Sequence, residues 1–219
     1  MIPINPLAAP TVGVPMQVIL LLTALTLLPA ILMSLTPFLR IVIVLHFLRQ
    51  ALGTQTAPSN QVLVGLSMFL TFLLIQPLAG SIYTDTWIPF EKGQLSVTQA
   101  AEKASLPVKG YISRFVREKD VELFLKASGT PAPKTKDDLP ISVLAPAYVL
   151  SELKTSFQIG AILFIPFLIV DVVVASITVS IGMVQLPPVM ISAPFKILLF
   201  VLVDGWNLVI GSLLASFRS

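Results

Sequence analysis

The sequence predicts an all-α membrane protein made of two long, kinked helical hairpins separated by a small helical domain outside the cytoplasm. The first observation is composition: 55% of the 219 residues are hydrophobic, 11% are charged, and the mean hydropathy is +0.91. A soluble domain carries about 25% charged residues. The second observation is that the apolar residues gather in four long runs, and the third is that most charges lie between the second and third runs. This chain therefore needs lipid or large partners to cover its surface.

Each apolar run is long enough to cross a hydrocarbon core of about 30 Å. The runs cover residues 18–35 (continuing more weakly to residue 48), 62–82, 157–185 and 197–217. Only Asp171 interrupts the third run, and only Asp204 interrupts the fourth. Helices are expected because backbone groups in lipid must be satisfied within the segment. We therefore expect a first hairpin within residues 1–83, a charged domain at 84–140 and a second hairpin at 141–219.

Two turns join the hairpins, a polar one at residues 53–60 and a proline-rich one at 184–194. Arg49 lies next to the first turn and Lys196 directly follows the second. Because Lys and Arg near the membrane favour the cytoplasmic side, we expect both turns in the cytoplasm and the charged domain and both termini outside. Residues 1–15 contain no Lys or Arg, so a signal peptide with a basic start is not expected.

The charged domain holds 17 of the 25 charged residues within residues 85–138, nine basic and eight acidic. This balance argues against a nucleic-acid surface, which needs a basic face. We expect a helix near 94–104, a second helix starting at Pro107, and a loop at 129–140. A further helix should start near residue 141 and continue into the third apolar run.

Residues suited to catalysis are scarce. There is no cysteine, His46 is the single histidine, and no phosphate-binding glycine loop is present. A packed or interfacial His46 is the simpler alternative to a general base. We therefore expect neither an enzyme nor a bound cofactor or metal.

Five ionisable residues lie in apolar surroundings: Arg40, Glu152, Asp171, Lys196 and Asp204. Such groups are costly in lipid and usually face a partner or water. We expect Lys196 to pair with Glu152 or Asp171, since an unpaired buried lysine tends to lose its proton. The alternative is that Lys196 and Arg40 extend to the headgroups.

The second turn contains the sequence GMVQLPPVM at residues 182–190. Flexible side chains here, contributed by several subunits, would close a pore and still yield to a passing chain. An ordinary tight turn is the simpler interpretation. Prolines and small residues inside the apolar runs suit close packing in an oligomer better than a lone bundle.

Several motifs resemble the FliP family of flagellar type III export proteins and its injectisome counterparts, the SctR group. Residues 146–160 (PAYVLSELKTSFQIG) resemble one signature, and PFK at 194–196 followed by VDGW at 203–206 resembles a second. The segments FLR at 38–40, LRQALG at 48–53, PSNQ at 58–61 and FLT at 69–71 are similar to the first hairpin. The resemblance covers residues 35–217, and the general run of the sequence resembles the flagellar branch.

This resemblance implies a core subunit of the export gate, in the inner membrane at the flagellar basal body. Family members form a pentameric ring that joins FliQ-type and FliR-type gate proteins and contacts an FlhB-type switch protein. Unfolded flagellar proteins pass through the middle, and energy is supplied elsewhere. The resemblance also implies that the helices are raised out of the bilayer plane, where hydropathy reports burial against protein as well as lipid.

One departure concerns the pore gasket that the family builds from successive methionines after the glycine of the second turn. Here Met183 is followed by Val184 and Gln185, so a gasket would use mixed side chains. Two other functions stay open on the residues alone. A solute or ion transporter would use Asp171, Asp204 and Lys196 as a relay, and a receptor would use the charged domain.

Overall fold

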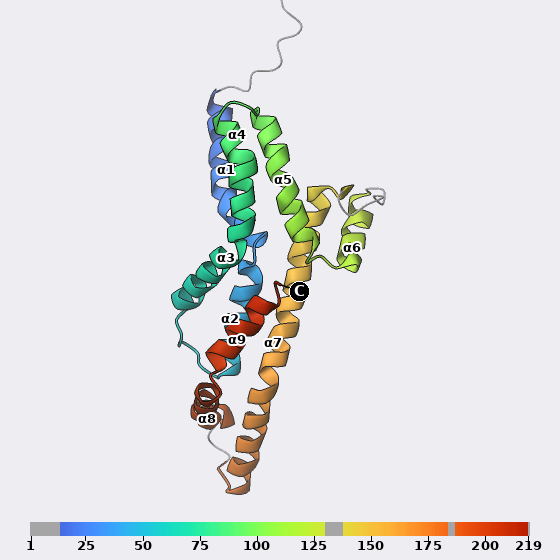
Figure 1. Cartoon of the computed structure of the whole chain (residues 1–219). Coiled ribbons are helices and arrows are strands. Elements are labelled where there is room, and N and C mark those ends of the chain that lie inside the picture. Colours follow the sequence, from blue (N-terminus) through green and yellow to red (C-terminus); the bar gives the residue numbers. More distant parts are fainter. Residues whose placement is uncertain (1–13, 130–137, 184–186, 219) are drawn as a thin grey trace, which may run out of the picture.

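The computed structural model describes residues 14–129, 138–183 and 187–218, and every regular element within these ranges is helical (Figure 1). Two helical segments, Asn60–Glu91 and Ile141–Ser180, are long and apolar enough to cross a membrane, and two bent pairs raise the number to four if each is one span. The helices, in chain order, are α1 (Val14–Ser34), α2 (Phe38–Ala51), α3 (Asn60–Ile82), the π-helical η1 (Tyr83–Trp87), α4 (Ile88–Glu91), α5 (Val97–Ser113), α6 (Glu118–Ser128), α7 (Ile141–Ser180), α8 (Pro188–Leu202) and α9 (Gly205–Ala215).

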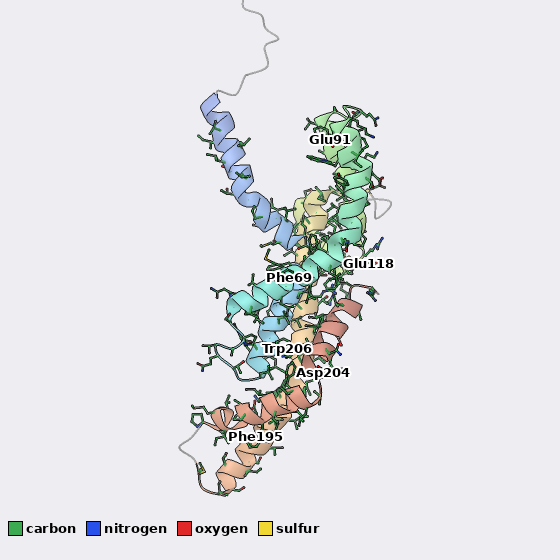
Figure 2. All side chains as sticks on the ribbon, turned by 60° about the vertical axis from the view of Figure 1, so that its left-hand side comes forward. Phe69, Glu91, Glu118, Phe195, Asp204 and Trp206 are labelled. Atoms are coloured by element: carbon green, nitrogen blue, oxygen red, sulfur yellow. The ribbon has the colours of Figure 1, made fainter. Side chains whose placement is uncertain are left out.

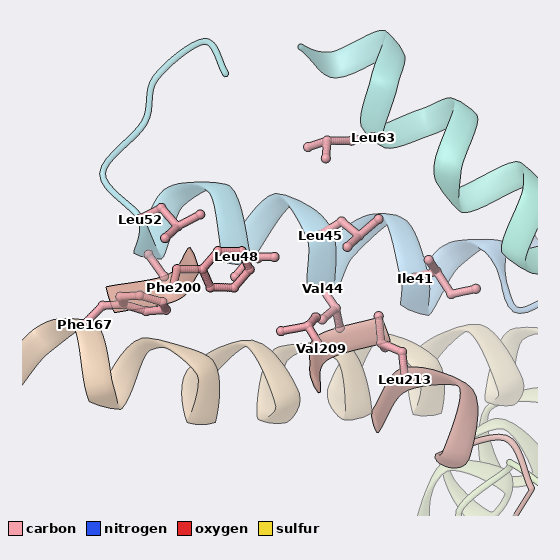
Figure 3. Close-up of a cluster of buried hydrophobic side chains, with 11 residues drawn as sticks. Ile41, Val44, Leu45, Leu48, Leu52, Leu63, Phe167, Phe200, Val209 and Leu213 are labelled. Carbon is pink, nitrogen blue, oxygen red and sulfur yellow. The ribbon is translucent and has the colours of Figure 1, made fainter. Parts of the chain in front are cut away.

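Helix α2 lies at the centre of the main apolar cluster (Figure 3). Its buried side chains include Ile41, Val44, Leu45 and Leu48, which are at most 1% exposed. They pack with side chains from α3, α7, α8 and α9, so that four helices are assembled around one. The first apolar run therefore provides both a largely exposed helix, α1, and a helix at the centre of the apolar core, α2.

The bend of 65° between α1 and α2 divides this first run. Pro37 stands directly before α2, with φ of −54°, and the residue before a proline is disfavoured in helical geometry. These local restrictions explain why the helix is interrupted at Pro37. The bend directs α2 toward the protein core and leaves α1 outside the core (Figure 2).

The fourth apolar run is also bent, at Asp204, the charged residue that interrupts it in the sequence. Helices α8 and α9 meet at 67°. At the break Asp204 has a φ of 51°, a left-handed conformation that Asp tolerates better than most residues. Gly205 follows, and a Cβ there would lie 2.2 Å from the ring of Phe200. The close approach of Phe200 therefore requires glycine.

Helix α7 has 40 residues and so spans about 60 Å. Its end is closed by Gly182, whose φ is 78° and whose N–H bonds to Val179 O at 3.0 Å. The chain then reverses, and α8 begins at Pro188. The predicted turn at 184–194 is therefore too long, because proline is well suited to the first position of a helix.

The charged domain contains α5 and α6. A capping box between Ser96 and Gln99 starts α5, and Gly129, with φ of 64°, ends α6. Pro107 lies inside α5, so the prediction that it starts a second helix is wrong. The capping box and the packing of Ile112 against α7 outweigh the one hydrogen bond that a proline removes. Of the predicted loop at 129–140, residues 130–137 lie outside the described ranges.

Much of the apolar surface is exposed. On α7 this includes Ile162, Ile169 and Val172, each more than 60% exposed, and on α3 it includes Phe69 and Phe72. Exposed apolar areas of this extent mark contact with protein or lipid.

The contact between α2 and α7 gives a test of this packing. Phe47 lies over Gly160, where a Cβ would come within 2.5 Å of the ring. We expect Gly160→Ala to lower the free energy of unfolding by about 1–3 kcal/mol, because the helices must move apart. Thermal unfolding in detergent measures this.

The matched control is Gly80→Ala in α3, where an added Cβ meets nothing within 4 Å. It should be neutral or stabilising by about 0.5–1 kcal/mol, because alanine favours a helix. Equal destabilisation by both changes would contradict the close α2–α7 contact.

Candidate functional site

Arg40, near the start of α2, forms the first of two junctions between buried charges. Its Nε lies 2.7 Å from Glu152 Oε2 and its Nη2 lies 2.5 Å from Glu152 Oε1, a two-pronged contact between α2 and α7. Its Nη1 donates to Ser216 O at 3.1 Å and to Ser216 Oγ at 3.0 Å, beyond the end of α9. The side chains of Arg40 and Glu152 are only 4% and 0% exposed. This Arg40 junction joins three parts of the chain that are far apart in sequence.

Two aromatic rings complete the Arg40 junction. The guanidinium carbon lies 4.0 Å from the ring centre of Phe217 and 5.4 Å from that of Phe115, and the two rings meet edge to face at 5.7 Å. A cation over an aromatic face is attracted by the ring's charge distribution, more strongly when water is excluded. Phe115 follows α5, so the charged domain also contacts this junction.

Lys196 on α8 forms the second junction. Its Nζ lies 2.6 Å from Asp171 Oδ2 on α7 and donates to Ala51 O at the end of α2 at 3.2 Å. Ser192 Oγ donates to the other oxygen of Asp171 at 2.5 Å. The Lys196 side chain is 3% exposed and that of Asp171 is 24% exposed. This Lys196 junction holds the second hairpin together and ties it to the first.

The two junctions show which acid pairs with each cation. Lys196 lies against Asp171, and Glu152, the other residue considered, meets Arg40. Asp204 joins neither junction: it is exposed at the α8–α9 break, where its Oδ2 accepts a hydrogen bond from Asn207 at 3.2 Å. The His46 ring lies between an oxygen of α2 and an oxygen of α3. Its Nδ1 is 2.7 Å from Val42 O, and its Nε2 is 2.7 Å from Asn60 Oδ1. That position fits an interfacial histidine.

Of the three predicted gasket residues, the structure describes Met183, which follows the end of α7. Met183 is 41% exposed, and Val184 and Gln185 lie outside the described residues. Met183 also lines an apolar cleft of about 640 Å³ between α7 and α8, together with residues such as Ile177 and Phe195. Figure 2 shows Phe195 on α8 at this end of the molecule.

A polar contact between the charged domain and α7 escaped the sequence analysis. Asp120 of α6 is 1% exposed, pairs with Lys154, and accepts a hydrogen bond from Ser151 Oγ at 2.7 Å. Arg117 donates to Gln158 Oε1 at 2.7 Å and to Thr155 Oγ1 at 3.1 Å. The polar residues within 151–158 could have indicated this contact, because they lie along one helix and need polar partners.

The environment of Asp120 sets its charge. Burial by itself would raise the pKa of this carboxyl, but the hydrogen bonds from Lys154 and Ser151 and the nearby positive charges hold the pKa below its ordinary value. The carboxylate is thus the stable form where α6 meets α7. Within the described ranges no group of three His, Cys, Asp or Glu residues is placed to hold a metal ion.

Comparison with known proteins gives a consistent result. A family model described as "FliP family" matches residues 21–213. Flagellar biosynthetic protein FliP of Pectobacterium carotovorum is 51% identical over 93% of this chain and 79% of that protein. The protein of the same name from Bacillus subtilis is 50% identical over 92% of this chain and 91% of its own length, and that of Borreliella burgdorferi is 40% identical over 92% and 81%.

The Arg40 junction predicts a large effect of removing the cation. Arg40→Ala leaves the charge of Glu152 buried without its partner, so the free energy of unfolding should fall by about 3–5 kcal/mol. Chemical unfolding in detergent measures it. Replacing both residues, as Arg40→Met with Glu152→Met, should lower the free energy of unfolding less than Arg40→Ala does, because no buried charge is left without a partner.

Arg49→Ala on the same helix is the matched control, since among the described residues Arg49 donates a hydrogen bond only to the carbonyl of Pro58, at 3.3 Å. Its cost should stay below about 1 kcal/mol. A similar loss for both single variants would contradict the importance of the buried pair.

The contact of Asp120 predicts that α6 leaves α7 in acid. Because the folded pKa is lowered, the stabilisation is complete above the ordinary pKa of about 3.9 and is lost as the pH falls through the lower folded value. The chain has no cysteine, so a fluorophore on Lys119→Cys reports α6 alone. Its anisotropy should be high at neutral pH and fall only below about pH 4.

Adding Asp120→Asn should give low anisotropy at neutral pH and remove the acid transition. An unchanged transition in that variant would assign the pH response to another group.

Proposed function

This chain belongs to the FliP family, and from that premise we propose that it forms part of the wall of the pore through which unfolded flagellar proteins are exported. Its family and its candidate membrane helices make it a membrane component of the flagellar export apparatus. The finer proposal is a ring of several copies, five by family resemblance. FliQ-type and FliR-type proteins would join the ring, and an FlhB-type protein would contact it.

The observation that carries this proposal is the α7–α8 hairpin. It extends beyond the body formed by α2, α3 and α9 (Figure 1). The Lys196 junction braces it, while Ile169, Val173 and Ile177 on α7 remain more than half exposed. A rigid hairpin with an apolar outer face and an exposed methionine near its tip is suited to line or close a pore built from several copies.

The apolar cleft beside Met183 supports assembly. Apart from Thr178, its lining is aliphatic, aromatic or thioether side chains, and its volume is about 640 Å³. Contiguous apolar surface of this kind marks contact with protein or lipid. Such a surface gains free energy when a neighbouring subunit covers it, at roughly 25 cal/mol for each Å² buried. We propose that neighbouring subunits contact the hairpin here.

The transporter alternative is less well supported. Of the relay residues, Asp171 pairs with Lys196 and accepts a hydrogen bond from Ser192 Oγ. Among the described contacts Asp204 bonds to Asn207 and not to this pair, whereas Lys196 and Asp171 join α8 to α7. These groups fit a structural role between helices.

The mass of the purified complex tests the proposal. We expect the full chain, produced with its flagellar export partners, to form a stable ring of several copies that retains small membrane proteins. A monomer or dimer that does not bind those partners would contradict the proposed ring. Solute flux in liposomes would then test the transporter function.

A second experiment tests the gasket. Replacing Met183, Val184 and Gln185 together by glycine should make cells leak ions and small dyes while the complex keeps its mass, because the side chains that close the pore are removed. Dye entry into cells producing the complex measures this leak.

Met33→Gly is the matched control, since Met33, at the end of α1, has a similar exposure of 40%. It should leave the membrane tight. A tight membrane in the triple variant, with the complex intact, would identify residues 182–190 as a plain turn.

A further inference from the structure

A second large cleft lies away from the hairpin tip, between α3, the end of α5 and the residues after α9. Its volume is about 620 Å³, within the range of small-molecule sites. Unlike the cleft beside Met183, it combines apolar walls with charge: Arg114 and Arg218 both line it. Neither of the two junctions uses these arginines.

Both guanidinium groups are available. Arg114 and Arg218 are exposed, and no hydrogen bond or ion pair of either side chain is found among the described residues. Two cations beside one cleft repel each other, and an anion between them relieves this repulsion. Guanidinium groups bind phosphate oxygens through paired, charge-assisted hydrogen bonds.

The apolar walls of the cleft indicate a ligand that is larger than a simple anion. Leu73, Leu74 and Pro77 of α3 form one side, and Phe217 forms another. Beyond the cleft, α3 also carries Phe69, labelled in Figure 2. Phe69 and Phe72 are 78% and 73% exposed. A ligand that fits has an anionic head and long apolar chains.

Tyr111 adds an aromatic residue to the lining of the cleft. Its hydroxyl is buried, so this side chain contributes apolar surface to the cleft wall.

We propose that this cleft binds an anionic phospholipid, with its phosphate between Arg114 and Arg218 and its acyl chains along α3. Basic pockets between membrane helices bind such head groups. The site joins the first hairpin, the charged domain and the C-terminal segment. It also shares Phe217 with the Arg40 junction, so a bound lipid would reinforce the place where these three parts meet.

The test titrates the full chain, purified in neutral detergent, with dioleoyl-phosphatidylglycerol and counts bound lipid by native mass spectrometry. The natural chain should bind phosphatidylglycerol more tightly than phosphatidylcholine, and excess inorganic phosphate should not displace it. Arg114→Gln with Arg218→Gln should weaken binding by about tenfold or more, since charge-assisted hydrogen bonds are lost.

The matched control is Lys103→Gln with Lys119→Gln, which removes the same charge from exposed positions of α5 and α6 outside the cleft. It should bind phosphatidylglycerol as the natural chain does. Arg114→Lys with Arg218→Lys keeps both charges and should retain most of the affinity for phosphatidylglycerol. If the glutamine variant does not fold, a complete loss of phosphatidylglycerol binding in this lysine variant would contradict recognition by charge.

Three outcomes would overturn the proposal. Equal binding of both lipids by the natural chain would show no recognition of the anionic head, and displacement by inorganic phosphate would identify a site for free anions. A glutamine variant that loses its oligomeric mass but keeps its lipid would assign the arginines to a carboxylate of a neighbouring protein.

Discussion

The pairing of Arg40 with Glu152 is the constraint on which the other contacts depend. Both charges are removed from water inside an apolar layer, and a buried charge that loses its partner is strongly destabilising. Any packing of α2 against α7 that separates them is therefore penalised, which fixes how the two helices align. Since Arg40 also holds Ser216, the same interaction fixes the end of the chain beyond α9.

The Lys196 junction extends this alignment to the other end of α2. Its ammonium group meets both Asp171 and the carbonyl of Ala51, so α8 is attached to α7 and to α2 at once. Helix α8 is held there while α9 must reach the Arg40 junction. The bend at Asp204 lets one apolar run satisfy both requirements.

This arrangement separates the parts that hold the protein together from the parts that face its surroundings. Within 151–158 of α7, Glu152 contacts α2, and four residues contact the charged domain: Ser151, Lys154, Thr155 and Gln158. Much of the FliP-like signature in this region therefore lies at contacts between helices. The outer faces of α1, α3 and the α7–α8 hairpin are left apolar and exposed. Those faces are where lipid and other subunits of an export apparatus would bind.

The sequence by itself determined that the chain is helical and membrane-associated, because composition and the length of apolar runs depend only on which residues are present. Local backbone restrictions also explain the bend at Pro37 and the start of α8 at Pro188, although neither boundary was predicted from the sequence. Pro107 shows the limit of local rules, since the capping box and packing of α5 carry the helix through it.

Only the tertiary structure decided which charges meet. Glu152 and Asp171 lie on one helix, roughly 28 Å apart at 1.5 Å per residue, and both are plausible partners in sequence. Lys196 reaches Asp171 because of where α8 crosses α7, and that crossing is set by contacts between residues far apart in the chain. Side-chain spacing along a helix determines which groups are present on a face, but the position of the neighbouring helix determines which of them are paired.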